Sequence, residues 1–265
     1  MLEANNLSKS YPSPAGDLVV LRDVSLTLAP GDAACVMGPS GSGKSTLLYI
    51  LGGLEPPTSG TVTLDATNPY TLNAEGLAAF RNREVGFVLQ DHCLLPQCTV
   101  LENVLVGLDR AIPGGTAAML FGTPGYRRAE AAARVRALEE LRFVGLEQAA
   151  NRIAGQLPYG DQRRLEIARA LATGATLILL DEPAAGMNPS ETTELAALVE
   201  RIRTRGVTVL LIEHHMNVVM KISDRVAVLD HGVKIAEGTP AEVRANPEVV
   251  RAYLGGTTAA AQVAA

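Results

Sequence analysis

Nine consecutive residues have the types and spacing of a phosphate-binding loop of the pattern G-x-x-x-x-G-K-[ST]. They are Gly38, Pro39, Ser40, Gly41, Ser42, Gly43, Lys44, Ser45 and Thr46. Glycines in such a loop let backbone N–H groups surround phosphates, while Lys44 reaches the outer phosphates and Ser45 can hold Mg²⁺. The apolar runs at 33–37 and 47–51 predict the strand and helix that must flank the loop. We therefore expect a nucleoside triphosphate site rather than a glycine-rich structural turn.

Two adjacent acids follow a second apolar run far downstream. Asp181 and Glu182 come directly after residues 176–180, which predict a buried parallel strand. At the tip of such a strand, Asp181 can orient the magnesium shell and Glu182 can polarise the water that attacks the γ-phosphate. A strand followed by a polar turn would look similar, but the phosphate loop favours the catalytic interpretation.

The segment 157–171 lies between these two motifs and predicts a turn that opens an amphipathic helix. With both motifs in place, the chain resembles the ATPases of ABC transporters over nearly its whole length. In that family this segment is the signature that completes the nucleotide site of the opposite subunit. The resemblance implies that Gly160, at the start of the helix, approaches the γ-phosphate bound by a partner.

Three further positions acquire a role through the same resemblance. It implies that Tyr11 stacks on adenine, that Gln90 senses Mg²⁺ and couples to the membrane subunits, and that His214 is the switch histidine. Taken alone, these would be a surface or core tyrosine, a solvated loop glutamine and a structural histidine. Their order and spacing around the two strong motifs favour the functional roles.

The chain also departs from the common family pattern at four positions. Pro158 and Tyr159 replace the serine and first glycine of the signature, Asn188 stands where many relatives carry aspartate, and His215 stands where aspartate is usual. Because Gly160 remains and the helix N-terminus still carries its dipole, we interpret the signature as a subfamily variant.

Two branches of the family are represented in the two parts of the chain. Up to about residue 98, the segments 47–52 and 81–87 resemble ATPases of lipoprotein-release and macrolide-export type. From about residue 107, the resemblance is to the ATPase of branched-chain amino-acid importers, carried by the segments 157–160, 182–189, 212–214 and 237–240. Recombination, an error of gene assembly or a deliberate joining of sequences would each produce this pattern.

The motifs predict an α/β fold with a P-loop NTPase core, which is a RecA-like, mostly parallel sheet, plus an N-terminal antiparallel β subdomain and an inserted α-helical subdomain. The expected divisions are an ATPase domain at 1–254, with core and β subdomain at 1–98 and 157–238, a helical subdomain at 99–156, and a disordered tail at 255–265. Further strands are expected at 84–89, 207–212, 225–229 and 232–236, and helices at 129–144, 190–204, from 240 and near 247.

Composition narrows the class of partners. A formal net charge of −5 argues against a nucleic-acid-binding surface. The apolar runs are strand-sized and the N-terminus lacks a signal-peptide pattern, so a cytoplasmic protein held at the inner face of the cell membrane by a partner is expected.

Three cysteines without a paired pattern indicate a reducing compartment. His92, Cys93 and Cys98 could in principle hold a metal, but a fourth ligand at a recognised spacing is absent.

The resemblance thus implies an ATPase that binds ATP and Mg²⁺, pairs as a homodimer or with a related ATPase, and drives integral-membrane permease subunits. Branched-chain amino-acid import is preferred because that resemblance covers the longer part of the chain. A lipoprotein-release or macrolide-type export ATPase is the alternative. A soluble ABC ATPase is the alternative of another class, and a non-hydrolysing interaction module is disfavoured by Lys44 and Glu182. The transported substrate and its direction stay open.

Overall fold

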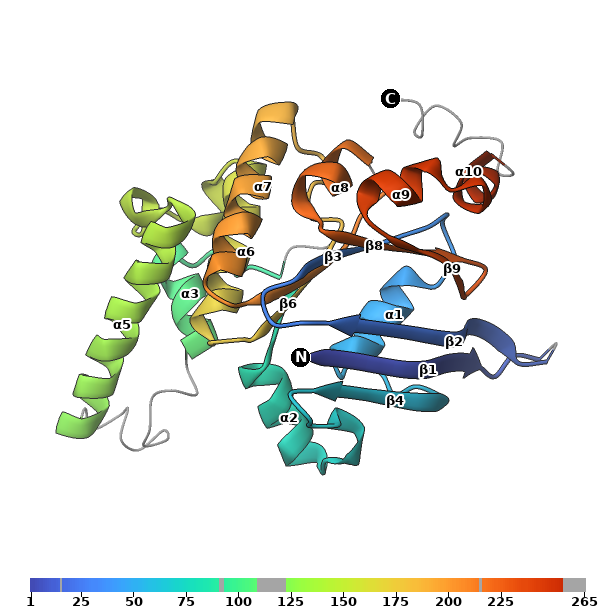
Figure 1. Cartoon of the computed structure of the whole chain (residues 1–265). Helices are drawn as coiled ribbons and strands as arrows, with labels where there is room; N and C mark the ends of the chain where they lie inside the picture. The colour runs from blue at the N-terminus through green and yellow to red at the C-terminus, as the bar shows by residue number, and fades with distance from the viewer. Residues whose placement is uncertain (15, 91–92, 109–122, 215, 255–265) are drawn as a thin grey trace. The chain divides into compact units, whose positions relative to one another are not determined.

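The computed structural model describes residues 1–14, 16–90, 93–108, 123–214 and 216–254. The chain divides into two compact units: unit 1 comprises Met1–Gln90 and Thr176–Ala265, and unit 2 comprises Asp91–Ala175. Figure 1 shows the elements of both units in chain order, from blue to red. Several sequence predictions fall outside the described residues, namely the tail at 255–265, His92 and His215.

Unit 1 contains an antiparallel sheet, here called sheet A, with the strand order β2-β1-β4. Its strands are β1 (Leu2–Tyr11), β2 (Leu18–Leu28) and β4 (Ser59–Leu64). Leu2, Ala4 and Leu7 are buried, whereas Glu3 is half-buried and residues 5–6 are exposed, as in a sheet with one covered face. An N-terminal antiparallel β subdomain was expected from the sequence, and β4 joins β1 on the side away from β2.

A second sheet, sheet B, forms the centre of unit 1, with the strand order β5-β6-β7-β3-β8-β9. Its strands are β5 (Val85–Val88), β6 (Leu177–Asp181), β7 (Thr208–Ile212), β3 (Ala33–Met37), β8 (Arg225–Asp230) and β9 (Val233–Gly238). All neighbours pair in parallel except β8 and β9. Every residue of β3, β6 and β7 is buried, as in sheets covered on both faces.

Helices cover both faces of sheet B. Helix α1 (Lys44–Leu51) packs between the two sheets, and its leucines and Ile50 join a core that both sheets share. Helices α7 (Pro189–Thr204) and α8 (Met216–Ile222) cover the other face (Figure 1). The remaining helices of unit 1 are α2 (Ala74–Arg83), α9 (Pro240–Ala245), α10 (Pro247–Leu254) and the short η1 (Pro69–Thr71).

The strand order places three loops at one edge of sheet B. Strand β3 lies between β7 and β8, and β6 lies on the far side of β7. In the parallel register, Ile212 at the end of β7 lies opposite both Val36 and Asp181. The loops after β3, β6 and β7 therefore leave from the same carboxyl edge, where open α/β sheets bind their ligands.

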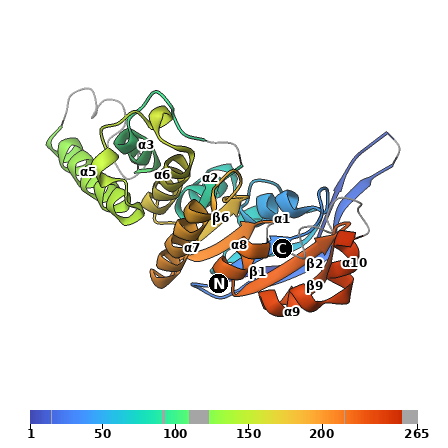
Figure 2. The same ribbon diagram turned by 90° about the horizontal axis from the view of Figure 1, so that it is seen from above.

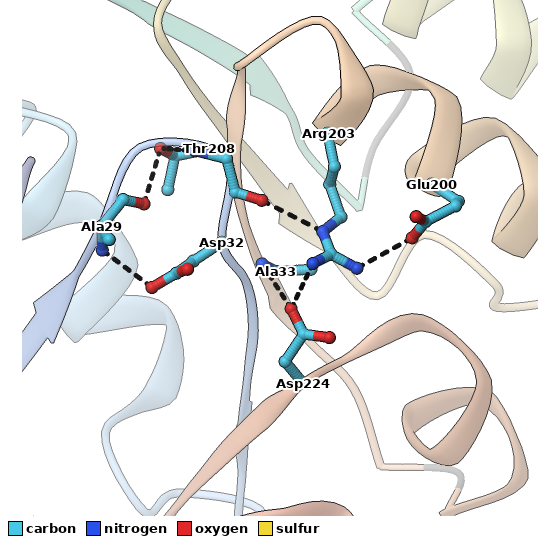
Figure 3. A network of polar contacts seen from close by, with 8 residues as sticks. Ala29, Asp32, Ala33, Glu200, Arg203, Thr208 and Asp224 are labelled. Carbon is cyan, nitrogen blue, oxygen red and sulfur yellow. Dashed lines mark hydrogen bonds and ion pairs between the residues drawn. The ribbon is translucent and has the colours of Figure 1, made fainter.

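A polar network secures the opposite edge of sheet B (Figure 3). The Arg203 guanidinium, near the end of α7, donates to the Gly31 carbonyl oxygen over 3.1 Å and pairs with Asp224 and, over 2.8 Å, with Glu200. The Thr208 hydroxyl accepts the Gly31 N–H over 3.2 Å. These bonds connect the turn before β3 to the starts of β7 and β8. They therefore hold the amino end of β3, whose carboxyl end leads into the phosphate loop.

Unit 2 is helical (Figure 2). Its elements are α3 (Val100–Leu108), α5 (Pro124–Val144), α6 (Tyr159–Ala172), η3 (Glu147–Ala149) and η4 (Ala154–Gln156). Helix α6 packs against α3 and α5, so unit 2 includes residues on both sides of the helical subdomain expected at 99–156. The boundaries of the functional subdomains stay a prediction.

The amphipathic helix expected at 129–144 makes up most of α5, which begins five residues earlier. Its start moves to Pro124 because Thr123 caps the first turn with its hydroxyl and proline suits the first helical position. It ends where Gly145 takes a left-handed φ of 81°.

Candidate active site

The phosphate loop joins β3 to α1 at the carboxyl edge of sheet B. Gly43, the residue before α1, has a φ of 98°. It has no side chain that could cap the helix, so it leaves the first backbone N–H groups of α1 available to a ligand. Lys44 Nζ donates to the carbonyl oxygens of Gly38 and Pro39, both over 2.9 Å. The loop therefore offers backbone donors and one ammonium group to an anion, as phosphate sites at helix N-termini do.

Two glycines of the loop are required by close packing. At Gly38, where φ is 149°, an added Cβ would lie 2.1 Å from the Leu229 carbonyl oxygen. At Gly43, a Cβ would lie 2.8 Å from the Val20 carbonyl oxygen. Within the part of the chain that the structure describes, the buried hydroxyl of Ser42 has no hydrogen-bond partner. A loop that is packed this closely and leaves a donor unsatisfied fits a bound phosphate group.

Lys44 shares its surroundings with both predicted acids. Burial lowers the pKa of the Lys44 ammonium, while the negative charges of Glu182 and Asp181 act to raise it. Asp181 is the last residue of β6 and is 6% exposed. The structure thus brings the phosphate loop and the acid pair, which lie far apart in the sequence, into one electrostatic environment.

Glu182 adopts an unusual backbone conformation. Its φ of 47° lies in the left-handed region, which costs a residue other than glycine about 1–3 kcal/mol. Its backbone N–H donates to the Ile212 carbonyl oxygen over 3.0 Å, which anchors the turn to the end of β7. Strain of this kind is concentrated at functional sites, where the surrounding structure holds it in place.

His214 lies next to Glu182. His214 Nδ1 is 3.5 Å from Glu182 Oε1, and both side chains are partly exposed. The sequence predicted both residues separately, and the loops after β6 and β7 bring them together.

Glu213 was not among the residues predicted from the sequence, and it is fully buried beside this pair. Its position in the sequence could have indicated it, because Glu213 directly follows a buried apolar strand. In the same way, Asp181 ends such a strand and Glu182 follows it.

Tyr11 ends β1 in a small polar cluster. Its hydroxyl donates to Glu55 Oε2 over 2.8 Å, and Lys9 Nζ lies 4.9 Å from the ring centroid and 2.9 Å from Glu55 Oε1. Burial, followed by the bond to Glu55, raises the pKa of the Tyr11 hydroxyl, against the effect of a hydrogen bond with Thr46. Tyr11 therefore lies beside the end of the phosphate loop, as an adenine-stacking residue would have to.

Two further predicted residues, Gln90 and Gly160, lie at the end of the first segment of unit 1 and in unit 2, respectively. Gln90 is exposed, two residues beyond the end of β5, and is the last residue before the chain enters unit 2. Gly160 belongs to unit 2, where it is buried in the first turn of α6. Pro158 precedes this helix with no side-chain cap, and Gln162 closes the turn by donating to the Leu157 carbonyl oxygen over 2.9 Å. The roles of Gln90 and Gly160 stay predictions.

The structure explains two of the departures from the family pattern. Tyr159 packs on Arg163, whose guanidinium carbon is 5.9 Å from the ring centroid and whose Nη2 is 3.2 Å from the hydroxyl. Arg163 in turn forms a buried ion pair of 2.9 Å with Glu166. Asn188 caps α7 through a reciprocal capping box with Glu191. Since asparagine and aspartate cap helices about equally well, replacing the usual aspartate preserves this helix start.

The donor groups suit magnesium better than a transition metal. Across the described ranges, no group of three or more His, Cys, Asp or Glu residues could hold a metal ion. The exposed hydroxyl of Ser45 and the carboxylate of Asp181 are oxygen ligands, which Mg²⁺ prefers, and Mg²⁺ takes several of its other ligands from water and phosphate. The residues present therefore fit a magnesium ion that arrives with a nucleotide.

Comparison with known proteins places this arrangement in a family. The model of the ABC transporter family matches residues 21–185, which include the phosphate loop, the signature segment and both acids. The chain belongs to the ABC transporter family. A second model, described as branched-chain amino acid ATP-binding cassette transporter, matches residues 233–259 of this ABC protein.

Relatives from both branches predicted by the sequence match the chain. The high-affinity branched-chain amino acid transport ATP-binding protein LivG of Salmonella typhimurium is 44% identical over 258 residues, which cover 96% of this chain and 98% of the relative. The corresponding protein BraF of Pseudomonas aeruginosa is 41% identical over the same lengths. The lipoprotein-releasing system ATP-binding protein LolD 1 of Rhodopirellula baltica is 38% identical over 231 residues, which cover 87% of this chain and 94% of that protein.

Solved ABC cassettes share the fold. A dimeric cassette in a post-hydrolysis state with ADP and Pi has a TM-score of 0.76 and 33% identity, and the alignment covers 91% of this chain and 99% of the other. A cassette in its ADP conformation has a TM-score of 0.81 and 29% identity over 96% and 98% of the chains. The predicted fold class and the assignment as an ATPase are thereby confirmed. Among the helices that the structure describes, none combines the length and hydropathy needed to cross a bilayer.

Proposed function

We propose that this chain is the ATP-hydrolysing subunit of a branched-chain amino-acid importer and that it energises separate membrane permease subunits. The observation that carries the proposal is the identity of 41–44% to branched-chain transport ATPases over 96% of the chain. The C-terminal match at 233–259, to a model specific for that transporter class, supports it independently.

In this proposal, the residues of unit 1 bind and orient ATP. The backbone N–H groups of the phosphate loop and of the first turn of α1 contact the phosphates, and Lys44 neutralises their outer charge. The ring of Tyr11 stacks on the adenine. Ser45, Asp181 and Gln90 would hold Mg²⁺, which offsets the negative charge of the phosphates.

Glu182 and His214 carry the chemical step. The Glu182 carboxylate orients the attacking water and accepts its proton, which is the role of a general base. The His214 imidazole, 3.5 Å from that carboxylate, fixes its direction. Water attacks phosphorus while the bond to the leaving oxygen of ADP breaks, so the products are ADP and inorganic phosphate.

A partner subunit completes each site. One solved relative is a dimer bound to ADP and Pi. For this chain we propose a homodimer, or a heterodimer with a related ATPase, in which Gly160 and the N-terminus of α6 face the nucleotide of the other subunit. The assembly works at the cytoplasmic face of the membrane, where the permease holds it.

Reconstitution with permeases tests the proposed function. The ATPase rate is measured in proteoliposomes that contain a branched-chain amino-acid permease pair with its binding protein and, separately, a lipoprotein-release permease. Stimulation by the amino-acid permease alone is the expected result. The Lys44→Ala variant controls for contaminating ATPases, because it removes the ammonium group of the phosphate loop.

Lipoprotein release is the second candidate, and the 38% identity to a lipoprotein-releasing ATPase over 87% of the chain favours it. Stimulation by the lipoprotein permease alone would replace the proposed substrate class with this one. If neither permease stimulated turnover and the protein failed to co-purify with membranes, a soluble ABC ATPase would become the better assignment.

A further inference from the structure

Glu213 joins the two loops that carry the proposed catalytic residues. Its side chain is fully buried at the end of β7. Glu213 Oε1 accepts the Ala184 N–H over 3.3 Å, and Oε2 accepts the His214 N–H over 2.9 Å. One carboxylate therefore bonds to the loop after β6 with one oxygen and to the loop after β7 with the other.

The two bonds are made in the same two loops as the contact between Glu182 and His214. Ala184 is two residues beyond Glu182, whose left-handed backbone must be held by its surroundings. His214 Nδ1 lies 3.8 Å from Glu213 Oε2 and 3.5 Å from Glu182 Oε1, so the imidazole sits within reach of both carboxylates. The distance between the two catalytic side chains depends on how these loops are fastened.

Glu213 also connects the loops to the strand below the phosphate loop. Its N–H donates to the Val36 carbonyl oxygen over 3.4 Å. Burial and the negative charge of Glu213 raise the pKa of the Cys35 thiol well above its usual value. Cys35 is therefore a neutral packing neighbour, and the backbone N–H groups supply hydrogen bonds to the buried carboxylate.

We propose that Glu213 is a positioning residue for ATP hydrolysis, which holds the loop of Glu182 against the loop of His214 through its two carboxylate oxygens. The inference rests on the proposed function, in which Glu182 and His214 act on ATP. Because its carboxylate oxygens bond to the loops that carry Glu182 and His214, its loss should affect the chemical step more than the binding of ATP.

Glu213→Gln is the sharpest perturbation because it keeps the size and shape of the side chain. An amide has one acceptor oxygen, and its NH₂ group would face one of the two backbone N–H groups, so one bond is lost. We expect kcat to fall by about tenfold or more while KM for ATP changes by less than about twofold. Cys35→Ala is the matched control, since it alters packing beside the same carboxylate but leaves both hydrogen bonds, and its kcat should stay near that of the parent.

A double-mutant cycle separates positioning from general destabilisation. The rates of Glu213→Gln, His214→Ala and the double variant are measured per folded, ATP-binding protein. If Glu213 acts through His214, the double variant should be no slower than His214→Ala within about threefold. A rate equal to the product of the two single effects would overturn the proposal, as would a parent-like kcat of Glu213→Gln while His214→Ala is slow. A parent-like kcat of His214→Ala would instead refute the catalytic role of His214, and with it the basis of the inference.

Discussion

Replacing Gly38 by alanine tests how tightly the phosphate loop is packed. The new Cβ would lie 2.1 Å from the Leu229 carbonyl oxygen and 2.6 Å from Ser42 Oγ, at a φ of 149° that side chains rarely tolerate. Backbone strain of about 1–3 kcal/mol and overpacking of a similar size should reduce the free energy of unfolding by roughly 2–6 kcal/mol. That is a large fraction of the stability of an ordinary domain.

Gly41 provides the control within the same loop. Its φ is 78°, but an added Cβ would meet nothing within 4 Å. Gly41→Ala should therefore cost only the left-handed penalty of about 1–2 kcal/mol. Urea unfolding of both variants without nucleotide, followed by far-UV circular dichroism, gives the comparison. Equal losses in the two variants, or a Gly38→Ala protein as stable as the parent, would refute the packing argument.

The remaining predictions concern adenine binding, the polar network of Arg203 at the edge of sheet B opposite the phosphate loop, and stability at alkaline pH. Tyr11→Ala should weaken ATP binding by about 1–3 kcal/mol in titration calorimetry, while Tyr11→Phe, which keeps the ring, should be nearly neutral; an unchanged affinity of Tyr11→Ala would place adenine elsewhere. Arg203→Ala removes the bonds to Gly31 and Asp224 and should lower the melting temperature without changing kcat per folded protein, because it lies at the edge of the sheet away from the acids; a lowered kcat would contradict that separation. Burial raises the pKa of Tyr253 to about 12. Because an unfolded tyrosine ionises near pH 10, this residue stabilises the fold below pH 10, and the stabilisation is lost between about pH 10 and 12. Tyr253→Phe should lessen that alkaline loss by up to about 2 kcal/mol, and an identical pH profile in the two proteins would refute the assignment.

The local parts of the site were predictable from the sequence. Strands β3, β6 and β7 are buried on both faces and therefore appear as unbroken apolar runs, and their ends differ from the predictions by a residue at most. The phosphate loop and the acid pair follow such runs directly. Helix α7 begins at Pro189, one residue before the predicted start, because Asn188 caps it.

Features that depend on distant partners were not predictable in the same way. Strand β4 is exposed along its first half and is defined by its pairing with β1, more than 50 residues earlier. The contact of Tyr11 with Glu55, and that of Glu182 with His214, likewise require the tertiary fold. Glu213 follows a buried strand, as the predicted acids do, but the backbone groups that its oxygens bind are set by the tertiary fold.

The central claim is that Glu182 activates water for ATP hydrolysis at the phosphate loop. The most direct measurement is the turnover of purified Glu182→Gln, together with its ATP affinity and its elution on size exclusion. The account predicts unchanged ATP binding, a fall in turnover of about a hundredfold or more, and accumulation of an ATP-bound dimer. Turnover near that of the parent protein would contradict the account and remove Glu182 from the catalytic role.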